Sequence, residues 1–575
     1  MLILAFAFPL LVALLCLALN QRVTTRALGL SAAAGAAVAG GSLLAAVAQG
    51  ERDLSPQDWA ATGDTAFRLS LSLDGLSLGP ALLICFGGAL ALAALALALP
   101  ARLRGFGGLF AALLLTLMAT LAGIMLQEST LLPVAWALVA VLTFAALRAS
   151  GTQSADPPLP IGLLAGLLSA LALLGAALAL RDLAPTDPPS LAVLVGWTLA
   201  TLLAFGAAPL HGAFEEITAV PTGLAAPLLA LGLPLLAGVA LLREAAALVD
   251  LLPIWRTTLT GLGLLALLCC SAGALRERRV NRILGWLFSA QLGLVLVALG
   301  QPSPVPTSAA PALLLNAALT TLTAYLAFEP LERSAGTDNL ADLPARGRMA
   351  GPWLAMLIAA ASAVGLPGTW GFWARQWLFG APEASAVWMG PLLLAGSALM
   401  VVAYLAPLAT LWRAGGEQPS DGGLRAAQIC GLAAGLPLLA LGAVPQLAWQ
   451  TWGAQAQTAL IPDVTTTPQL PGLAGQIAGG LAALGLLALP ALLGNARRRP
   501  LRDPEERSGI QTPDALGESL RGLAWVGAPT GLFEGALAGL LAFSRGLRRL
   551  LALFEQRYYM AGLIVALIAV ILLML

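Results

Sequence analysis

The chain contains 575 residues, of which 59% are hydrophobic and only 10% are charged, and its formal net charge is +1. Soluble globular proteins are about 45–50% apolar and about 25% charged. This composition therefore excludes a soluble enzyme, a disordered protein and a nucleic-acid-binding protein. Hydrophobic runs long enough to cross a bilayer recur along the whole chain, so the sequence predicts an all-α polytopic membrane protein.

Sixteen segments are long and apolar enough to be transmembrane helices, because a span needs roughly 20 residues. They lie near 1–19, 27–48, 78–99, 106–126, 129–147, 159–180, 190–210, 221–242, 257–275, 282–300, 310–328, 351–372, 387–412, 426–446, 472–494 and 558–575. The runs are too long and too uniformly apolar for the strands of a barrel. The first run begins without a basic segment and has no clear cleavage site, so we expect a retained helix rather than a signal peptide.

The arginine residues predict the orientation of the chain in the membrane. All 30 basic residues are arginine, and the chain contains no lysine. If the N-terminus lies outside, 24 arginines fall in segments that face inside and 6 in segments that face outside. Because basic residues are enriched in cytoplasmic loops, this distribution predicts that both termini lie outside.

Two regions between the spans carry structure of their own. Residues 67–74 alternate between apolar and polar side chains, and an Asp74–Gly75 turn follows, which predicts a small β-hairpin near 65–77 on the outer face. Residues 530–556 distribute apolar and basic side chains in a helical pattern, which predicts an amphipathic helix along the inner face. We expect this C-terminal element to brace neighbouring subunits; a solvated connector is the alternative.

Proline and glycine interrupt two of the predicted spans, at 204–222 and at 364–376. They free backbone groups that need a cavity or neighbouring protein as a partner. Interrupted helices at corresponding places in two halves are typical of inverted-repeat transporters, so we expect two inverted five-helix repeats, helices 4–8 and 9–13. The predicted regions are 1–104 with helices 1–3 and the hairpin, 105–248 and 256–413 for the two repeats, 414–500 for helices 14 and 15, 501–556 for the amphipathic segment, and 557–575 for the last span.

Several short motifs, in this order, resemble the antiporter-like subunits of respiratory complex I, which have relatives in membrane-bound hydrogenases and multisubunit cation/proton antiporters. The motifs are Phe67–Ser77, Pro209-Leu-His211 with Glu216 and Pro221-Thr222, Ala237-Gly-Val239 with Arg243, Arg282–Gly293, and Gly365–Thr369 with Gly371-Phe-Trp373. The resemblance covers most of residues 1–450. The additional helices and the amphipathic segment resemble the longest subunit type, which ends in a lateral helix.

The chain departs from this family at the buried charged positions. The resemblance implies a glutamate on helix 5 and lysines on helices 7, 8 and 11, and this sequence has Ala137, Ala204, Leu236 and Asn316 at those positions. Only the terminal position on helix 12 keeps a charge, as Arg375. A buried lysine can switch between its charged and neutral forms, whereas an arginine stays protonated. The departures therefore predict a degenerate proton path.

Five residues remain candidates for a proton path: His211, Glu215, Glu216, Asn316 and Arg375. His211 is either a proton relay or a partner for freed backbone carbonyls. Glu215 and Glu216 either feed protons from the inner side or cap the second half-helix through its N-terminal dipole. Arg375 either ends a water path, pairs with an acid on a neighbouring subunit, or snorkels to the interface.

The other charged residues are predicted to have structural roles. We expect Arg243, Glu244 and Asp250 to be solvated at an outer helix end, and Glu329 and Glu332 to be loop charges after helix 11. The cluster at 276–282 indicates topology, with lipid headgroups as possible partners. The sequence contains no phosphate-binding loop, metal-ligand cluster or activated nucleophile, and its five cysteines fit no metal or disulfide spacing. We therefore expect no cofactor and no metal in this chain.

The favoured hypothesis is a non-catalytic, antiporter-like membrane-arm subunit of a proton-translocating assembly of the NADH-quinone oxidoreductase type. Its partners would be other membrane subunits and lipid, in a bacterial cytoplasmic membrane, and its role mainly structural. One alternative is an active proton transporter that uses a rerouted path through His211, Glu216 and water. Another is a subunit of a hydrogenase-type or multisubunit cation/proton antiporter complex.

Overall fold

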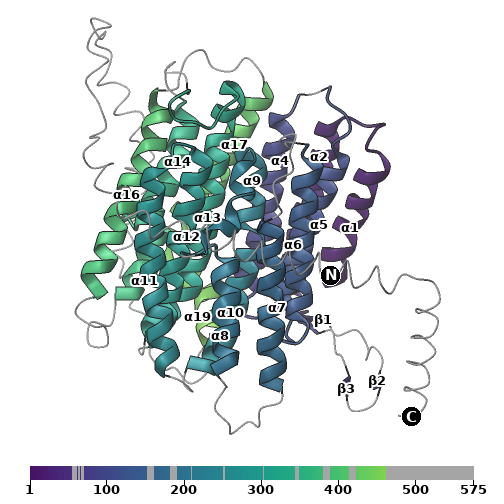
Figure 1. Cartoon of the computed structure of the whole chain (residues 1–575). Helices are drawn as coiled ribbons and strands as arrows, with labels where there is room; N and C mark the ends of the chain where they lie inside the picture. The colour runs from purple at the N-terminus through teal and green to yellow at the C-terminus, as the bar shows by residue number, and fades with distance from the viewer. Residues whose placement is uncertain are drawn as a thin grey trace, which may run out of the picture. The chain divides into compact units, whose positions relative to one another are not determined.

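The computed structural model describes residues 1–54, 61–62, 65–66, 70–100, 102–151, 161–181, 191–208, 210–249, 253–301, 304–343, 349–379, 389–413 and 422–460. These residues all belong to one compact unit. Within them the secondary structure is helical, apart from four strands of two residues each (Figure 1). The predicted all-α fold is therefore confirmed.

The helices follow the predicted order along the chain. The first part contains α1 (Leu2–Ala18), α2 (Thr25–Ala48), α3 (Leu78–Leu82), the π-helix η1 (Leu83–Gly87), α4 (Gly88–Ala98), α5 (Gly107–Met125), α6 (Leu132–Ala149), α7 (Ile161–Arg181) and α8 (Leu191–Ala204). Two 3₁₀ turns, η2 (His211–Phe214) and η3 (Ile217–Ala219), lead into α9 (Thr222–Ala230) and α10 (Leu233–Val249). The remaining helices are α11 (Pro253–Arg276), α12 (Val280–Leu299), α13 (Pro304–Ala335), α14 (Ala350–Val364), α15 (Trp370–Phe379), α16 (Met389–Arg413), α17 (Gly422–Ala443), α18 (Pro445–Ala448), the π-helix η4 (Trp449–Gly453) and α19 (Ala454–Leu460).

Eleven of the helical segments in the described part of the chain are long and apolar enough to cross a membrane. Shorter apolar helices occur at Leu2–Ala18, Val193–Ala204 and Ala350–Val364. Each span predicted up to residue 446 coincides with one of these helices. The spans near 472–494 and 558–575 and the amphipathic segment lie outside the described residues.

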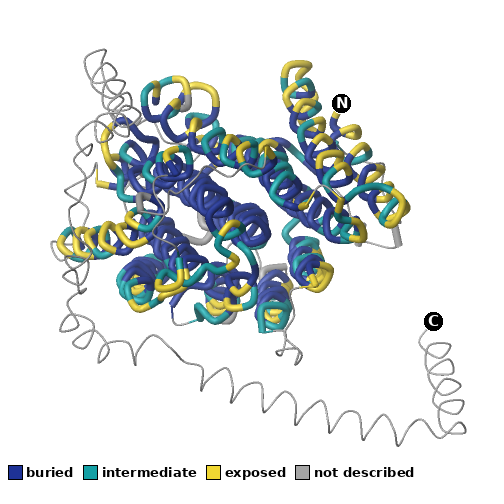
Figure 2. The backbone as a smooth tube through the Cα atoms, turned by 90° about the horizontal axis from the view of Figure 1, so that it is seen from above, coloured by how far each residue is buried: buried dark blue, intermediate teal, exposed yellow. Residues whose placement is uncertain are grey.

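Helix α13 forms the centre of the bundle. It packs against α9, α12, α14, α15 and α17, and the apolar window of its span is completely buried. Figure 2 shows buried residues on the helices in the interior and exposed residues on the outer helices. Many exposed side chains are large and hydrophobic, such as Leu11 on α1 and Leu405 on α16. This distribution fits a bundle whose outer surface faces lipid or other membrane subunits rather than water.

The predicted hairpin near 65–77 is wrong in its pairing. Strand β1 (Asp53–Leu54) pairs with β4 (Leu71–Ser72), and β2 (Ala61–Thr62) pairs with β3 (Thr65–Ala66), both antiparallel. The Asp74–Gly75 turn instead leads into α3. The Ser77 backbone N–H donates to the Asp74 carboxylate at 2.7 Å, and the Asp74 N–H donates to the Ser77 hydroxyl at 2.9 Å. Such reciprocal bonds favour a helix start over a hairpin turn.

Both predicted helix interruptions are confirmed. The first runs from the end of α8 to the start of α9, and Gly206 there has a left-handed φ of 52°. The second lies between α14 and α15, where Gly365 has a φ of 81°. A side chain at either position would be strained, because only glycine adopts this conformation without a steric cost.

Candidate functional site

Helix α12 closes the first interruption. The Ser289 hydroxyl lies 3.1 Å from the carbonyl oxygen of Phe205 and 3.0 Å from that of Gly206, where α8 has ended. At the other side of the break, the Asn281 amide donates to the Val220 carbonyl at 2.8 Å. Backbone groups that this break frees are therefore contacted by protein side chains, which is one of the two ways that irregular backbone persists inside a membrane.

His211 stacks on Trp286 of α12, with ring centroids 4.0 Å apart. The freed carbonyls at 205 and 206 accept from Ser289 and not from His211, so the predicted backbone-satisfying role falls to the serine. Glu215 is exposed and lies 3.6 Å from Arg282, measured between the carboxylate oxygen and the guanidinium nitrogen. The structure thus brings His211 and Glu215 to the first turns of α12.

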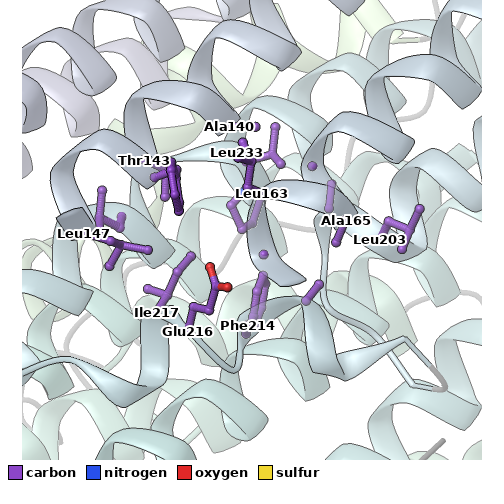
Figure 3. A pocket seen from close by; sticks show the side chains of 17 residues that line it. Ala140, Thr143, Leu147, Leu163, Ala165, Leu203, Phe214, Glu216, Ile217 and Leu233 are labelled. Carbon is purple, nitrogen blue, oxygen red and sulfur yellow. The ribbon is translucent and has the colours of Figure 1, made fainter. Parts of the chain in front are cut away.

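Glu216 points into a pocket between α6, α7 and α8 (Figure 3). The backbone N–H groups of Ile161 and Gly162, at the start of α7, donate to its carboxylate. The pocket is otherwise lined mainly by apolar side chains, and Ala204 is among them (Figure 3). The prediction that Glu215 and Glu216 cap the second half-helix is therefore wrong, since Glu216 caps α7, where a carboxylate is favourable.

The second half-helix, α9, is capped by two carboxylates from α13. The Thr222 N–H donates to Glu332 at 2.7 Å, and the Gly223 N–H donates to Glu329 at 2.5 Å. The side chain of Glu329 is 0% exposed. The prediction that Glu329 and Glu332 are loop charges is wrong, because α13 continues through Pro330 to Ala335.

This pair is the part of the site that sequence reasoning missed. The apolar run predicts a span that ends near residue 328, which places both glutamates in the loop after it. In the structure the helix continues past this run, and backbone N–H groups of α9 bind the two carboxylates. The spacing of Glu329, Glu332 and Arg333 at i, i+3 and i+4 was the available signal, because it places all three on one helix face.

At the second interruption, Asn316 of α13 bonds to the end of α14. Its side-chain oxygen accepts from the Ser362 hydroxyl at 2.7 Å, and its amide lies 3.4 Å from the Ser362 carbonyl oxygen. The Ser362 hydroxyl also accepts from the Gly371 N–H at 3.0 Å. Thr320, one turn along α13, donates to Gln291 of α12 at 2.8 Å. Asn316, where the sequence resemblance implied a lysine, is therefore a neutral group that holds the break together.

Replacing Ser362 with alanine is expected to lower the free energy of unfolding by about 1–3 kcal/mol, because the Gly371 N–H and the Asn316 oxygen would lose their buried partner. The free energy can be measured by SDS titration in detergent micelles. Ser334→Ala is the matched control, since the Ser334 hydroxyl donates only to the Leu331 carbonyl of its own helix in the contacts that the structure describes. Equal effects of the two substitutions would contradict the role assigned to Ser362.

Arg375 is buried rather than snorkelling, with 7% of its surface exposed. Its guanidinium donates to the Ala363 carbonyl and to the Ser397 hydroxyl, both at 2.6 Å. Ala363 belongs to the last turn of α14, where carbonyl groups lack helical partners. Arg375 therefore ties the broken end of α14 to α16, and its burial leaves no surface for an acid from another subunit.

The other positions at which the sequence resemblance implied charged residues are apolar. Ala204 and Leu236 are buried, and Ala137 is half-buried on α6. On α12, Phe288 lies between Trp286, which stacks on His211, and Gln291, which accepts a hydrogen bond from Thr320. The Phe288 ring stacks with the Phe214 ring at a centroid distance of 6.2 Å. Among the described residues, no group of three or more His, Cys, Asp or Glu side chains is arranged to hold a metal ion.

Arg243 is a structural anchor and not the solvated residue that the sequence predicted. Its guanidinium donates to the Asp74 carboxylate at 2.9 Å and to the carbonyls of Ile124 and Leu126 at 2.9 and 2.5 Å. Burial by itself would raise the pKa of Asp74, but the adjacent guanidinium and the Ser77 hydrogen bonds outweigh it and hold the pKa below its usual value. Glu244 is half-buried, and Asp250 lies outside the described residues.

Comparison with known proteins gives one family and one fold. Residues 160–401 match the family described as NADH:quinone oxidoreductase/Mrp antiporter, transmembrane region. The structure resembles the Mrp complex from Dietzia sp. DQ12-45-1b, with a TM-score of 0.69 and 21% identity over 100% of this chain. This chain spans 63% of the length of that Mrp chain.

Two further structures share the fold. The archaeal membrane-bound sulfane sulfur reductase, a respiratory membrane complex, gives a TM-score of 0.63 and 18% identity over 80% of this chain and 97% of that one. Respiratory complex I from Thermus thermophilus gives a TM-score of 0.58 and 23% identity over 78% of this chain and 98% of that one. No curated protein matches the chain by sequence. The chain is thus an integral, multi-pass membrane protein with the fold of these complexes' membrane subunits.

Proposed function

We propose that the protein, whose residues 160–401 match the family described as NADH:quinone oxidoreductase/Mrp antiporter, is an antiporter-like membrane subunit that acts mainly as a structural member of a proton-translocating assembly. Its own proton path is degenerate. Its partners are other membrane subunits, and it lies in a bacterial cytoplasmic membrane with both termini outside, in line with the distribution of arginine.

The observation that carries this proposal is the way in which both helix breaks are closed. The Ser289 hydroxyl lies within hydrogen-bond distance of two carbonyls that α8 leaves free, and Asn316 and Arg375 donate to carbonyls at the end of α14. Irregular backbone inside a membrane either lines a water-filled cavity or is buried in protein. Contacts of the second kind favour a scaffold that keeps the broken helices as packing elements.

The residues around the lost charges support the same role. Ala204 faces a pocket lined mainly by apolar side chains, and Leu236 packs its methyl groups against Gly123 of α5. Proton transfer through a membrane requires polar groups or water along the whole route. An apolar filling at these positions stabilises the bundle instead, because it avoids the cost of burying charges.

A coupling measurement tests this proposal. The assembly that contains the chain is purified and reconstituted in proteoliposomes, and the protons translocated per electron are measured for wild type, His211→Gln and Glu216→Gln. We expect all three ratios to agree, because a degenerate path does not need these groups. An uncoupler sets the zero of the assay, and Glu51→Gln, which changes an exposed carboxylate, is the matched control.

A lower ratio in Glu216→Gln or His211→Gln, in complexes that assemble fully, would contradict the structural role. It would favour the rerouted path, in which protons enter beside these residues. Loss of the complex without a change in the ratio of the remaining molecules would support a role in assembly.

A further inference from the structure

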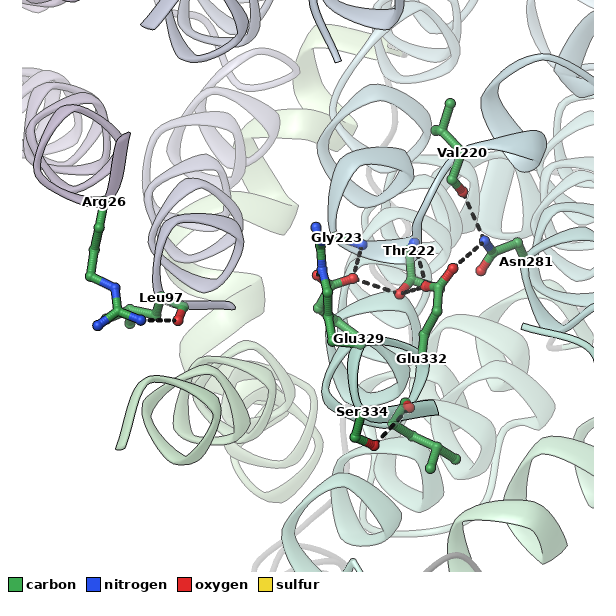
Figure 4. Close-up of polar contacts among 11 residues, drawn as sticks. Arg26, Leu97, Val220, Thr222, Gly223, Asn281, Glu329, Glu332 and Ser334 are labelled. Carbon is green, nitrogen blue, oxygen red and sulfur yellow. Dashed lines mark hydrogen bonds and ion pairs between the residues drawn. The ribbon is translucent and has the colours of Figure 1, made fainter. Parts of the chain in front are cut away.

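Glu329 and Glu332 of α13 meet at the hydroxyl of Thr222, the first residue of α9 (Figure 4). The Thr222 hydroxyl oxygen lies 2.8 Å from a carboxylate oxygen of Glu329 and 2.5 Å from one of Glu332. Both distances are in the range of O–H···O hydrogen bonds. One hydroxyl therefore joins two carboxyl groups in the buried part of the bundle.

The number of hydrogens favours an additional proton in this arrangement. A threonine hydroxyl donates one hydrogen, and an ionised carboxylate donates none. Two full hydrogen bonds at Thr222 need two hydrogens, and a protonated carboxyl group that donates to the hydroxyl oxygen supplies the second. Two ionised carboxylates that share a site also repel each other, which favours one shared proton.

The charges around the pair place the proton on Glu332. Arg333 forms an ion pair with Glu329 at 2.7 Å, so Glu329 is the carboxyl that stays ionised. Glu332 receives hydrogen bonds from neutral groups, the Thr222 N–H at 2.7 Å and the Asn281 amide at 3.4 Å. The other titratable groups near it are Tyr325 and Asp338, and Arg279 lies 3.9 Å from Asp338.

Asn281 adds a second, independent feature. It is buried, and its amide faces the pair, as Figure 4 shows. Its side-chain oxygen has no hydrogen-bond partner among the described residues. A buried acceptor without a donor costs about 1–3 kcal/mol, so a hydrogen brought beside Glu332 has a second acceptor here, besides the Thr222 hydroxyl.

We infer that Glu329, Thr222 and Glu332 form a binding site for one proton at the start of α9, separate from the family positions that have lost their charges. In the binding step, a hydronium ion transfers its proton to the Glu332 carboxylate and leaves as water; release is the reverse. Gly223 makes the approach possible, because a Cβ there would lie 2.6 Å from the Glu329 carboxyl carbon. The site rests on these contacts and not on the proposed function.

Infrared spectroscopy of the purified full-length chain in lipid nanodiscs tests the site. A protonated carboxyl has a C=O stretch that an ionised one lacks, and exchange into D₂O shifts it. We expect this band near neutral pH in wild type and its loss in Glu332→Gln. It should also be lost in Glu329→Gln, because removal of the neighbouring negative charge lets Glu332 ionise. Glu215→Gln changes an exposed carboxylate and should leave the band in place.

Each outcome decides the question. If the band survives in Glu329→Gln, the proton belongs to Glu332 alone and the shared site is wrong. If the band is missing in wild type, the site holds no proton. Thr222→Val keeps both carboxyls and should shift the band, so it tests the site even where the glutamine variants fail to fold; an unshifted band in Thr222→Val would overturn it. No transport is measured, so failure here is distinct from failure of the structural role.

Discussion

Replacing Gly223 with alanine is expected to lower the free energy of unfolding by about 2–4 kcal/mol, one of the two largest effects in the chain. The added Cβ would lie 2.6 to 2.8 Å from the carboxyl atoms of Glu329, closer than real Cβ atoms come to their neighbours. Glu329 would have to move, and the Gly223 N–H, which now donates to it at 2.5 Å, would lose its acceptor. The cost combines overpacking with an unsatisfied buried donor.

SDS titration of the full chain in micelles measures this effect, with Gly41→Ala as the matched control. Gly41 is also inside a helix, but a Cβ there meets no atom within 4 Å and the position is exposed. Alanine has the higher helix propensity, so this control should be unchanged or more stable by up to about 1 kcal/mol. If Gly223→Ala is as stable as Gly41→Ala, Glu329 does not occupy the place described.

Arg243→Met is expected to lower the free energy of unfolding by about 2–3 kcal/mol. The substitution removes the donors to Asp74, Ile124 and Leu126 and leaves a partly buried carboxylate without its cation, which is the costly way to break an ion pair. The side chains of Arg243 and Asp74 are 19% and 26% exposed. Water can therefore solvate part of the unpaired Asp74 carboxylate, and the free-energy cost is below that of breaking a fully buried pair.

A double-mutant cycle with Asp74→Asn separates the ion pair from the carbonyl contacts. Arg243→Met should remain destabilising in the Asp74→Asn background, because the Ile124 and Leu126 carbonyls still lose their donor. Arg104→Met, which removes an exposed arginine, should change stability by less than about 0.5 kcal/mol. Full suppression of the Arg243→Met effect by Asp74→Asn would show that the backbone contacts contribute nothing.

Much of the fold could be predicted from the sequence because its causes are local. A span is recognised by a run of apolar residues, and the breaks at Gly206 and Gly365 are recognised by glycine and proline, whose conformational preferences do not depend on distant residues. The absence of lysine is also visible without coordinates, and from it follows the prediction that Ala204 and Leu236 stand where the resemblance implies lysines.

The tertiary structure alone decided which charged groups meet. Thr222 and Glu332 are 110 residues apart, and Asp74 and Arg243 are 169 apart, so no local pattern joins either pair. Glu329 was predicted to be a loop charge because it lies just past the apolar run, yet inside the bundle two N–H groups of α9 and Arg333 make burial of the pair favourable. The sequence by itself determined the helices, their interruptions and the absence of lysine. Only the packing of α9 against α13 determined where carboxylates remain, because buried charge is stable only where distant residues supply its partners.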